Sequence, residues 1–207
     1  MLSPLVVNHI KRNAKKNNIK LPDEYKFVLL KWTKKYSISE KIIFSWLFDA
    51  GSKVLNASAT IPGIVLVNAE WASRLVLNAG DKEMETAFEL TIGHELTHHE
   101  NDYFFLDPFT KDEKFIYWIN EIHADFGGIQ KMFAGDVSQG EIAMRYKQRN
   151  RTKKDKDTYT HPSWEKRISF IKEHNFDEKL IRVVAQMTGC ENEHLIDRVC
   201  RHFERML

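Results

Sequence analysis

The sequence predicts a mostly α-helical α+β domain with a small antiparallel sheet. Apolar residues recur at helical spacing over most of the chain. Two short β-branched segments, 53–61 and 64–67, flank a Pro62-Gly63 turn and are expected to be strands. The 207 residues, of which 43% are hydrophobic and thirteen are Phe, are sufficient for a sizeable core.

Three helices are expected before the strands. Ser3 followed by Pro4 is typical of a helix start, and this first helix is expected to continue to about residue 17. A second helix, over 22–36, carries an apolar stripe, and a third, over 39–51, ends at a glycine.

Helices are expected again after the strands. One covers 68–80, and Asp81 caps the next, which ends before an aromatic-rich connection at 103–109. A further helix covers about 111–133. The stretch 145–157 is basic, lacks apolar periodicity and is expected to be a loop, and two or three amphipathic helices then finish the chain.

Residues 94–98, His-Glu-Leu-Thr-His, carry the clearest chemical signal. On a helix, positions i and i+4 lie one above the other, so His94 and His98 can bind one metal ion from the same side. Glu95 lies beside them, within reach of a water that the metal activates. This pattern is typical of zinc peptidases, and the alternative is an exposed helix that carries two histidines by chance.

A catalytic zinc site usually has three protein ligands and a water, so a third ligand is needed. Glu121 and Asp125 are four residues apart and share one face of a later helix, so one can bind the metal while the other orients a ligand. Ala124, Gly127 and Gly128 make this helix thin enough for close approach to the motif helix. The alternative is a solvated acidic face.

Two further histidines are expected to be non-ligands. His123 lies about 200° around the helix from Glu121, and His99 is rotated about 100° from His98. If Glu121 faces the metal, His123 on the same helix cannot, and if His98 faces it, His99 cannot.

Four segments together resemble a known family. His-Glu-Leu-x-His, followed by Glu-x-His-Ala-Asp at 121–125, is similar to the gluzincin metallopeptidases of the HtpX and CAAX-prenyl-protease type. Residues 56–67 are similar to that family's asparagine-alanine segment. Thr160-His161-Pro162-Ser163, with Arg167-Ile168 behind it, resembles the family's His-Pro box. The four segments have the family's order and approximate spacing over 56–170.

The resemblance implies a domain organisation and a site. A zincin-like catalytic domain would cover 52–173, with an N-terminal helical segment at 1–51 and a C-terminal helical extension at 174–207. The residues that match the family's zinc ligands are His94, His98 and Glu121.

The resemblance also implies roles for the other matching residues. Glu95 would be the general base, and Asp125 would support a ligand. Asn56 and His161 match positions that flank the substrate and stabilise the tetrahedral intermediate. A turn-closing Asn56 and a surface His161 before a helix-starting proline are the structural alternatives.

The predicted function is that of a zinc-dependent endopeptidase that binds one Zn²⁺ ion. A protein or peptide substrate is expected to add a strand to an exposed edge formed by Ile64, Val65, Leu66 and Val67. Two alternatives stay open. One is a latent or non-catalytic zinc-binding module, and the other is a peptidase that acts on nucleic-acid-bound proteins through the basic stretch 145–157.

Charge, hydropathy and cysteine content narrow the function classes. The net charge of +2 is nearly balanced, so nucleic acid is not the expected partner. No window approaches the ~18–20 apolar residues of a membrane span. Cys190 and Cys200 fit neither a zinc knuckle nor a disulfide framework. A soluble, cytoplasmic catalytic domain is therefore expected, unlike the membrane members of the family.

Overall fold

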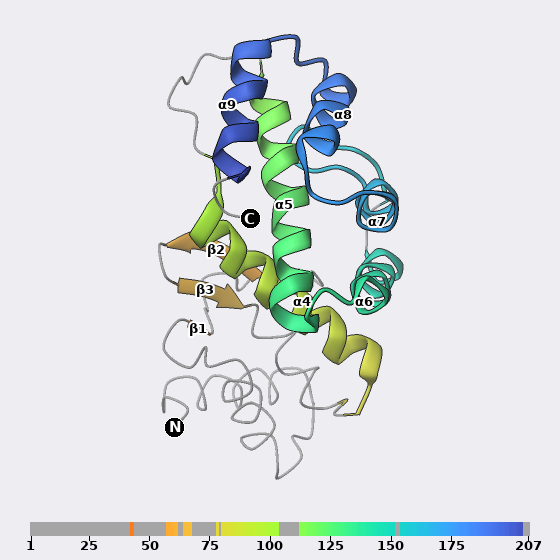
Figure 1. The fold of residues 1–207 in the computed structure, drawn as a ribbon. Coiled ribbons are helices and arrows are strands. Elements are labelled where there is room, and N and C mark those ends of the chain that lie inside the picture. The colour runs from red at the N-terminus through yellow and green to blue at the C-terminus, as the bar shows by residue number, and fades with distance from the viewer. Residues whose placement is uncertain are drawn as a thin grey trace.

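The structure, a computed structural model, describes residues 42–43, 57–61, 64–67, 78, 80–103, 112–151 and 154–204. The elements in these ranges are β1 (Ile42–Ile43), β2 (Ala57–Ile61), β3 (Ile64–Val67), α4 (Lys82–Asn101), α5 (Glu113–Phe133), α6 (Val137–Arg149), α7 (Trp164–Glu173), α8 (Glu178–Thr188) and α9 (Glu193–Glu204) (Figure 1).

Helix α5 is the axis of the described structure. Figure 1 shows α8 and α9 beside its N-terminal half, while α4 crosses its C-terminal half and α6 and α7 lie alongside. One buried apolar cluster joins α5 to α8 and α9 through residues such as Phe115, Leu180 and Phe203. A second joins α4 to α6 and α7 through residues such as Leu90 and Ile168. The second cluster also includes Ile129 of α5, so α5 contributes buried residues to both clusters.

Helix α4 begins where the sequence predicts. The Asp81 side chain accepts a hydrogen bond from the Met84 amide at 3.1 Å, which confirms Asp81 as the N-cap. A cap of this kind contributes about 1 kcal/mol to helix stability. The helix predicted over 111–133 is also confirmed, as α5, which begins after Asp112 and ends at the left-handed Ala134.

Helices α4 and α5 approach each other closely at their glycines. A Cβ atom on Gly128 would lie 2.9 Å from the His94 amide nitrogen, and one on Gly127 would lie 2.5 Å from Thr97 Cγ2. On the α4 side, a Cβ on Gly93 would lie 3.0 Å from Gly128 Cα. The predicted thin side of α5 is therefore confirmed, and it sets the distance between the two helices that carry the motif residues.

The predicted α+β fold with an antiparallel sheet is wrong. Six helices and no strand make up the ranges 80–103, 112–151 and 154–204, and the buried clusters are built from helix-to-helix packing. The short strand segments pair in the order β1-β3-β2, with β2 antiparallel to β3 but β1 parallel to it. This small group is a mixed sheet, and it lies against α4 (Figure 1).

Two local predictions are also corrected. Ile42 and Ile43 form β1, although they lie in the segment 39–51 that was expected to be helical. Residues 145–149 form the last turns of α6 instead of a loop. Asp136 caps α6 and its buried residues include Ala143 and Met144, so two small apolar contacts and a cap suffice for a helix whose other faces are polar.

None of the helices in the described part of the chain is both long and apolar enough to cross a membrane.

Candidate metal centre

Three predicted ligands converge between α4 and α5. Nε2 of His94 and Nε2 of His98 lie 3.0 Å apart, because one turn of α4 separates the two rings. Glu121, from the middle of α5, approaches both: Oε2 is 3.5 Å from His94 Nε2 and Oε1 is 3.5 Å from His98 Nε2. The three side chains are only slightly exposed. In the described ranges they are the one group whose donor atoms all lie within 4.8 Å.

A carboxylate orients each imidazole. His94 Nδ1 donates to Asp125 Oδ1 at 3.0 Å, and His98 Nδ1 donates to Asp102 Oδ1 at 2.7 Å. An ionised carboxylate can only accept, so both rings carry their proton on Nδ1. Both Nε2 atoms therefore face the same place, as in a metal site with oriented histidines.

The spacing of the three donor atoms can be compared with that of zinc ligands. With zinc–nitrogen distances of about 2.0–2.1 Å, tetrahedral geometry puts two ligand atoms about 3.3 Å apart. The observed separations of 3.0, 3.5 and 3.5 Å are close to this value. Two nitrogens and one oxygen are also a donor set that zinc accepts in catalytic sites. The residues present fit a zinc ion.

The electrostatics of these groups favour positive charge beside Glu121. Burial works against the charged form of His98, but hydrogen bonds with Asp102 and Glu121 outweigh it and raise the pKa to about 10. Burial likewise opposes ionisation of Glu121, but hydrogen bonds with His161 and both ligand histidines hold the pKa well below its usual range. Glu121 is thus an anion in a nearly buried place, and Arg167 and the two histidines lie beside it.

Both oxygens of Glu121 have a second neighbour. Oε1 is 3.2 Å from His161 Nε2, and Oε2 is 3.2 Å from Arg167 Nη1. His161 is half exposed and lies in the segment before α7. The structure therefore brings this predicted residue to the ligands, next to the carboxylate.

Arg167 is the buried cation of the centre. It lies on α7, is 5% exposed, and donates from Nε to Asp125 Oδ2 at 2.7 Å and from Nη2 to Asp125 Oδ1 at 2.5 Å. Its guanidinium also lies over the Trp164 ring, 4.3 Å from the centroid. Burial and the Arg167 charge act in opposite directions on Asp125, and the pKa of that carboxyl is lowered.

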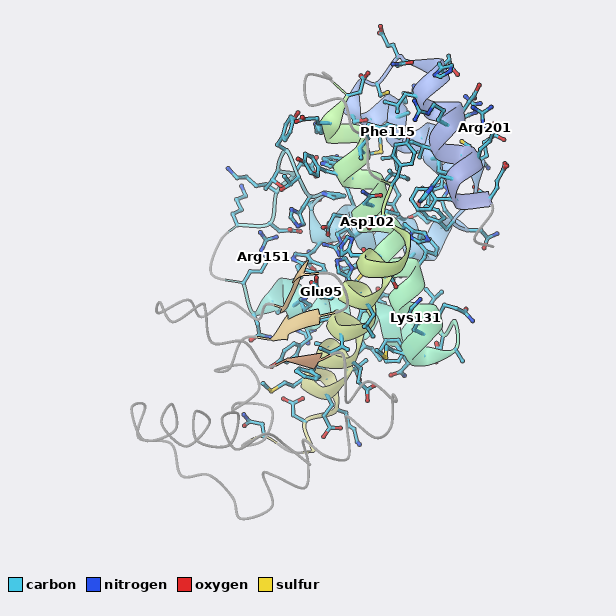
Figure 2. All side chains as sticks on the ribbon, turned by 90° about the vertical axis from the view of Figure 1, so that its left-hand side faces the viewer. Glu95, Asp102, Phe115, Lys131, Arg151 and Arg201 are labelled. Atoms are coloured by element: carbon cyan, nitrogen blue, oxygen red, sulfur yellow. The ribbon has the colours of Figure 1, made fainter. Side chains whose placement is uncertain are left out.

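Glu95, the predicted general base, lies next to the ligands on α4. Its side chain is partly exposed, and Figure 2 shows it where α4 passes the strands. Asp102, the C-cap residue that directly follows α4, is labelled further along, toward the C-terminal helices. Helix α4 and its C-cap therefore carry two predicted ligands, the candidate base, and the carboxylate that orients His98.

Lys147 reaches this region from α6. Its Nζ donates to Thr91 Oγ1 at 2.8 Å and lies 5.2 Å from the Trp164 ring centroid. Thr91 is one turn before Glu95 on the same face of α4. Burial, with a smaller contribution from Arg167, lowers the pKa of Lys147 to about 8, although Glu95 and the carboxylates of α5 oppose the shift.

His123 points away from the ligands. It is packed against Phe176 and Phe203, with ring centroids 4.7 and 4.4 Å away. Burial lowers the pKa of His123 to about 4, so the ring is neutral. Its predicted status as a non-ligand agrees with this position, whereas the side chain of His99 lies outside the described residues.

The remaining predicted site residues lie in or near the strands. Asn56 is outside the described residues. Ile64, Val65, Leu66 and Val67 form β3, which is the middle strand, with β1 on one side and β2 on the other. The expected exposed edge is not found at Val65 and Leu66, because β1 already pairs with these two residues.

The basic stretch 145–157 is largely neutralised in the structure. Arg145 pairs with Glu165 at 2.7 Å, Arg149 with Glu83 at 2.5 Å and Arg151 with Asp155 at 2.7 Å. Cations that already face carboxylates are poorly placed to follow a phosphate backbone. The geometry thus gives no support to nucleic-acid contact through these arginines.

The sequence analysis did not single out Asp102 or Lys147, and it noted Arg167 only as part of the segment behind the His-Pro box. Asp102 carries a recognisable signal, since it is four residues after His98, at the C-cap of the same helix. Arg167 lies 42 residues from its partner Asp125, and Lys147 lies 56 residues from Thr91. No local pattern indicates pairings over such separations.

Comparisons with models of known protein families, with curated proteins and with solved structures found no match.

Proposed function

We propose that this protein is a zinc-dependent endopeptidase. The observation that supports the proposal is the convergence of His94 Nε2, His98 Nε2 and Glu121 at 3.0–3.5 Å, with both Nδ1 atoms held by carboxylates. When bound, a zinc ion would supply a Lewis acid that lowers the pKa of a water. Peptide hydrolysis is favoured because a carboxylate follows the first ligand directly in sequence.

We assign the other roles in peptide hydrolysis to residues of the chain. His94, His98 and Glu121 bind the ion. A carboxylate oxygen of Glu95 accepts the proton of the attacking water and passes it to the nitrogen of the leaving amine. His161, half exposed beside Glu121, would donate a hydrogen bond to the carbonyl oxygen as negative charge develops there.

The substrate is a protein or peptide segment. Since β3 is paired on both sides, strand addition at 64–67 is not part of this proposal. The half-exposed His161 and the partly exposed Glu95 mark the side from which a peptide carbonyl can approach.

Glu95→Gln tests the proposal. A peptide library is digested with the zinc-loaded wild type, with Glu95→Gln and with Glu83→Gln, an exposed carboxylate in the first turn of the same helix. Wild type and Glu83→Gln should cleave and stop on addition of a chelator. Glu95→Gln should bind zinc as tightly as wild type but cleave at least about 10²-fold more slowly.

Two results would contradict the peptidase. Cleavage by Glu95→Gln at the wild-type rate would remove Glu95 from the chemistry. Tight zinc binding without cleavage of any library member would instead favour the non-catalytic zinc-binding module.

A further inference from the structure

Arg167 uses its guanidinium on two carboxylates of the metal centre at once. Nε and Nη2 form a bidentate pair with Asp125, and Nη1 lies 3.2 Å from Glu121 Oε2. The side chain is 5% exposed, and Trp164 covers one face of its plane. Bidentate geometry fixes the orientation of a carboxylate as well as its charge.

Each of these contacts leads to a metal ligand in one step. Asp125 Oδ1, which accepts from Arg167 Nη2, also accepts from His94 Nδ1 at 3.0 Å. Arg167 Nη2 itself is 3.4 Å from His94 Nδ1, a contact between two donors that the shared oxygen bridges. Through Asp125, Arg167 therefore fixes the ring of His94. Through Nη1, it holds Glu121 directly.

The charge balance gives Arg167 a second effect. Arg167 and Lys147 are cations from neighbouring helices that act on the carboxylates of Glu121, Asp125 and Glu95. Loss of the Arg167 charge would by itself strengthen attraction of a cation, so charge and positioning act in opposite directions.

We propose that Arg167 is the positioning residue of the metal centre, which sets the orientation of Glu121 and His94 and thereby the affinity for zinc. The contacts also join α7 to α5, so metal binding and docking of α7 are coupled. This inference rests on the proposed metal centre but not on peptidase activity, because zinc affinity is measured without substrate.

Arg167→Lys separates positioning from charge. Lysine keeps the positive charge but cannot form the planar fork. Zinc affinity is measured by competition with a chromogenic chelator, at a temperature where circular dichroism shows every variant to be folded. Arg167→Lys should bind zinc about 10- to 100-fold more weakly than wild type. The matched control is Arg182→Lys, an exposed arginine on α8 that contacts Glu178, Glu193 and Asp197, and its zinc affinity should be unchanged.

Two further measurements exclude a merely structural role. The visible spectrum of the cobalt-substituted protein should change in Arg167→Lys and not in Arg182→Lys, because it reports ligand geometry. The loss of zinc affinity caused by Arg167→Lys should also be smaller in an Asp125→Asn background than in wild type. In that background the effect of Arg167 through Asp125 is already lost, and only its contact with Glu121 remains.

Wild-type zinc affinity in Arg167→Lys would overturn the inference. So would an unchanged cobalt spectrum, or full additivity with Asp125→Asn. Each of these outcomes leaves the peptidase proposal intact, because that proposal depends on cleavage by wild type and its loss in Glu95→Gln.

Discussion

The Nε2 atoms of His94 and His98 face each other at 3.0 Å, while their Nδ1 atoms donate to Asp125 and Asp102. In the absence of a metal, a proton on one Nε2 can be shared between the two nitrogens. Helix pitch brings the rings together, and the two carboxylates fix how each ring is turned. Groups other than the three candidate ligands therefore set the orientation of both imidazoles.

Asp102→Asn should weaken zinc binding about 10- to 100-fold. The amide oxygen of asparagine accepts from His98 Nδ1 more weakly than a carboxylate does, and the amide can also turn its donor nitrogen toward the ring, so the proton is no longer fixed on Nδ1. Zinc affinity measured by chelator competition tests this. Asp136→Asn, which changes a carboxylate at the N-cap of α6, should leave zinc affinity unchanged. Equal affinities for both variants would show that Asp102 does not orient His98.

Gly128→Ala should damage the metal centre through the backbone. The added methyl would lie 2.9 Å from the His94 amide nitrogen, so α4 and α5 must separate and carry His94 away from Glu121. We expect a loss of about 1–3 kcal/mol in the free energy of unfolding and a clear loss of zinc affinity, measured by denaturant titration and chelator competition.

Gly140→Ala is the control for this variant. Its methyl would meet the end of the flexible Ile129 side chain instead of backbone. It should reduce stability but leave zinc affinity unchanged. If Gly128→Ala retained wild-type zinc affinity, the close contact of the two helices would not be what positions the ligands.

Lys147 should make stability depend on pH in the alkaline range. Burial lowers the pKa of Lys147 to about 8 in the folded state, against 10.5 when unfolded. Below pH 8 both states carry the charge, and the folded state bears the cost of burying it beside Arg167, with partial compensation by Glu95, Asp125 and Glu121. Between pH 8 and 10.5 the folded state releases the proton first, so the cost decreases as pH rises.

Lys147→Met should therefore be more stable than wild type below pH 8, by about 1–3 kcal/mol. The difference should shrink steadily toward pH 10.5. Denaturant unfolding of both proteins from pH 7 to 10.5 measures it. If the difference in the free energy of unfolding stayed constant with pH, the loss of the ammonium charge would not be the cause of the stabilisation.

His123→Leu should stabilise the protein. The imidazole is buried between Phe176 and Phe203, and its Nδ1 has no hydrogen-bond partner among the described residues. Removal of an unsatisfied buried polar group should add about 1 kcal/mol, which raises the melting temperature by about 2–4 °C. A lower melting temperature, in scanning calorimetry, would indicate that the imidazole has a favourable contact.

Local sequence patterns were sufficient for one part of this site. His94, His98, Glu121 and Asp125 come from two i,i+4 pairs, and Gly127 and Gly128 indicated the close helix contact that joins them. Helical geometry determines all of these relationships. Arg167 and Lys147 are different, because their partners lie on other helices and only the packed structure places them.

The prediction of the fold class was wrong for a related reason. The segments 57–61 and 64–67 were recognised as strands, but their partner β1 comes from residues 42–43, whose apolar neighbours indicated a helix. A two-residue strand is defined by its pairing and has no pattern of its own. The position of β3 in the middle of the sheet, which closes the expected substrate edge, followed from the same pairing.

X-ray absorption at the zinc edge tests the metal centre most directly. A sample of the protein loaded with one equivalent of zinc should show only nitrogen and oxygen ligands, at about 2.0–2.2 Å, with the multiple-scattering signature of two imidazoles. A zinc–sulfur distance of about 2.3 Å, or a spectrum without two imidazoles, would contradict the site formed by His94, His98 and Glu121.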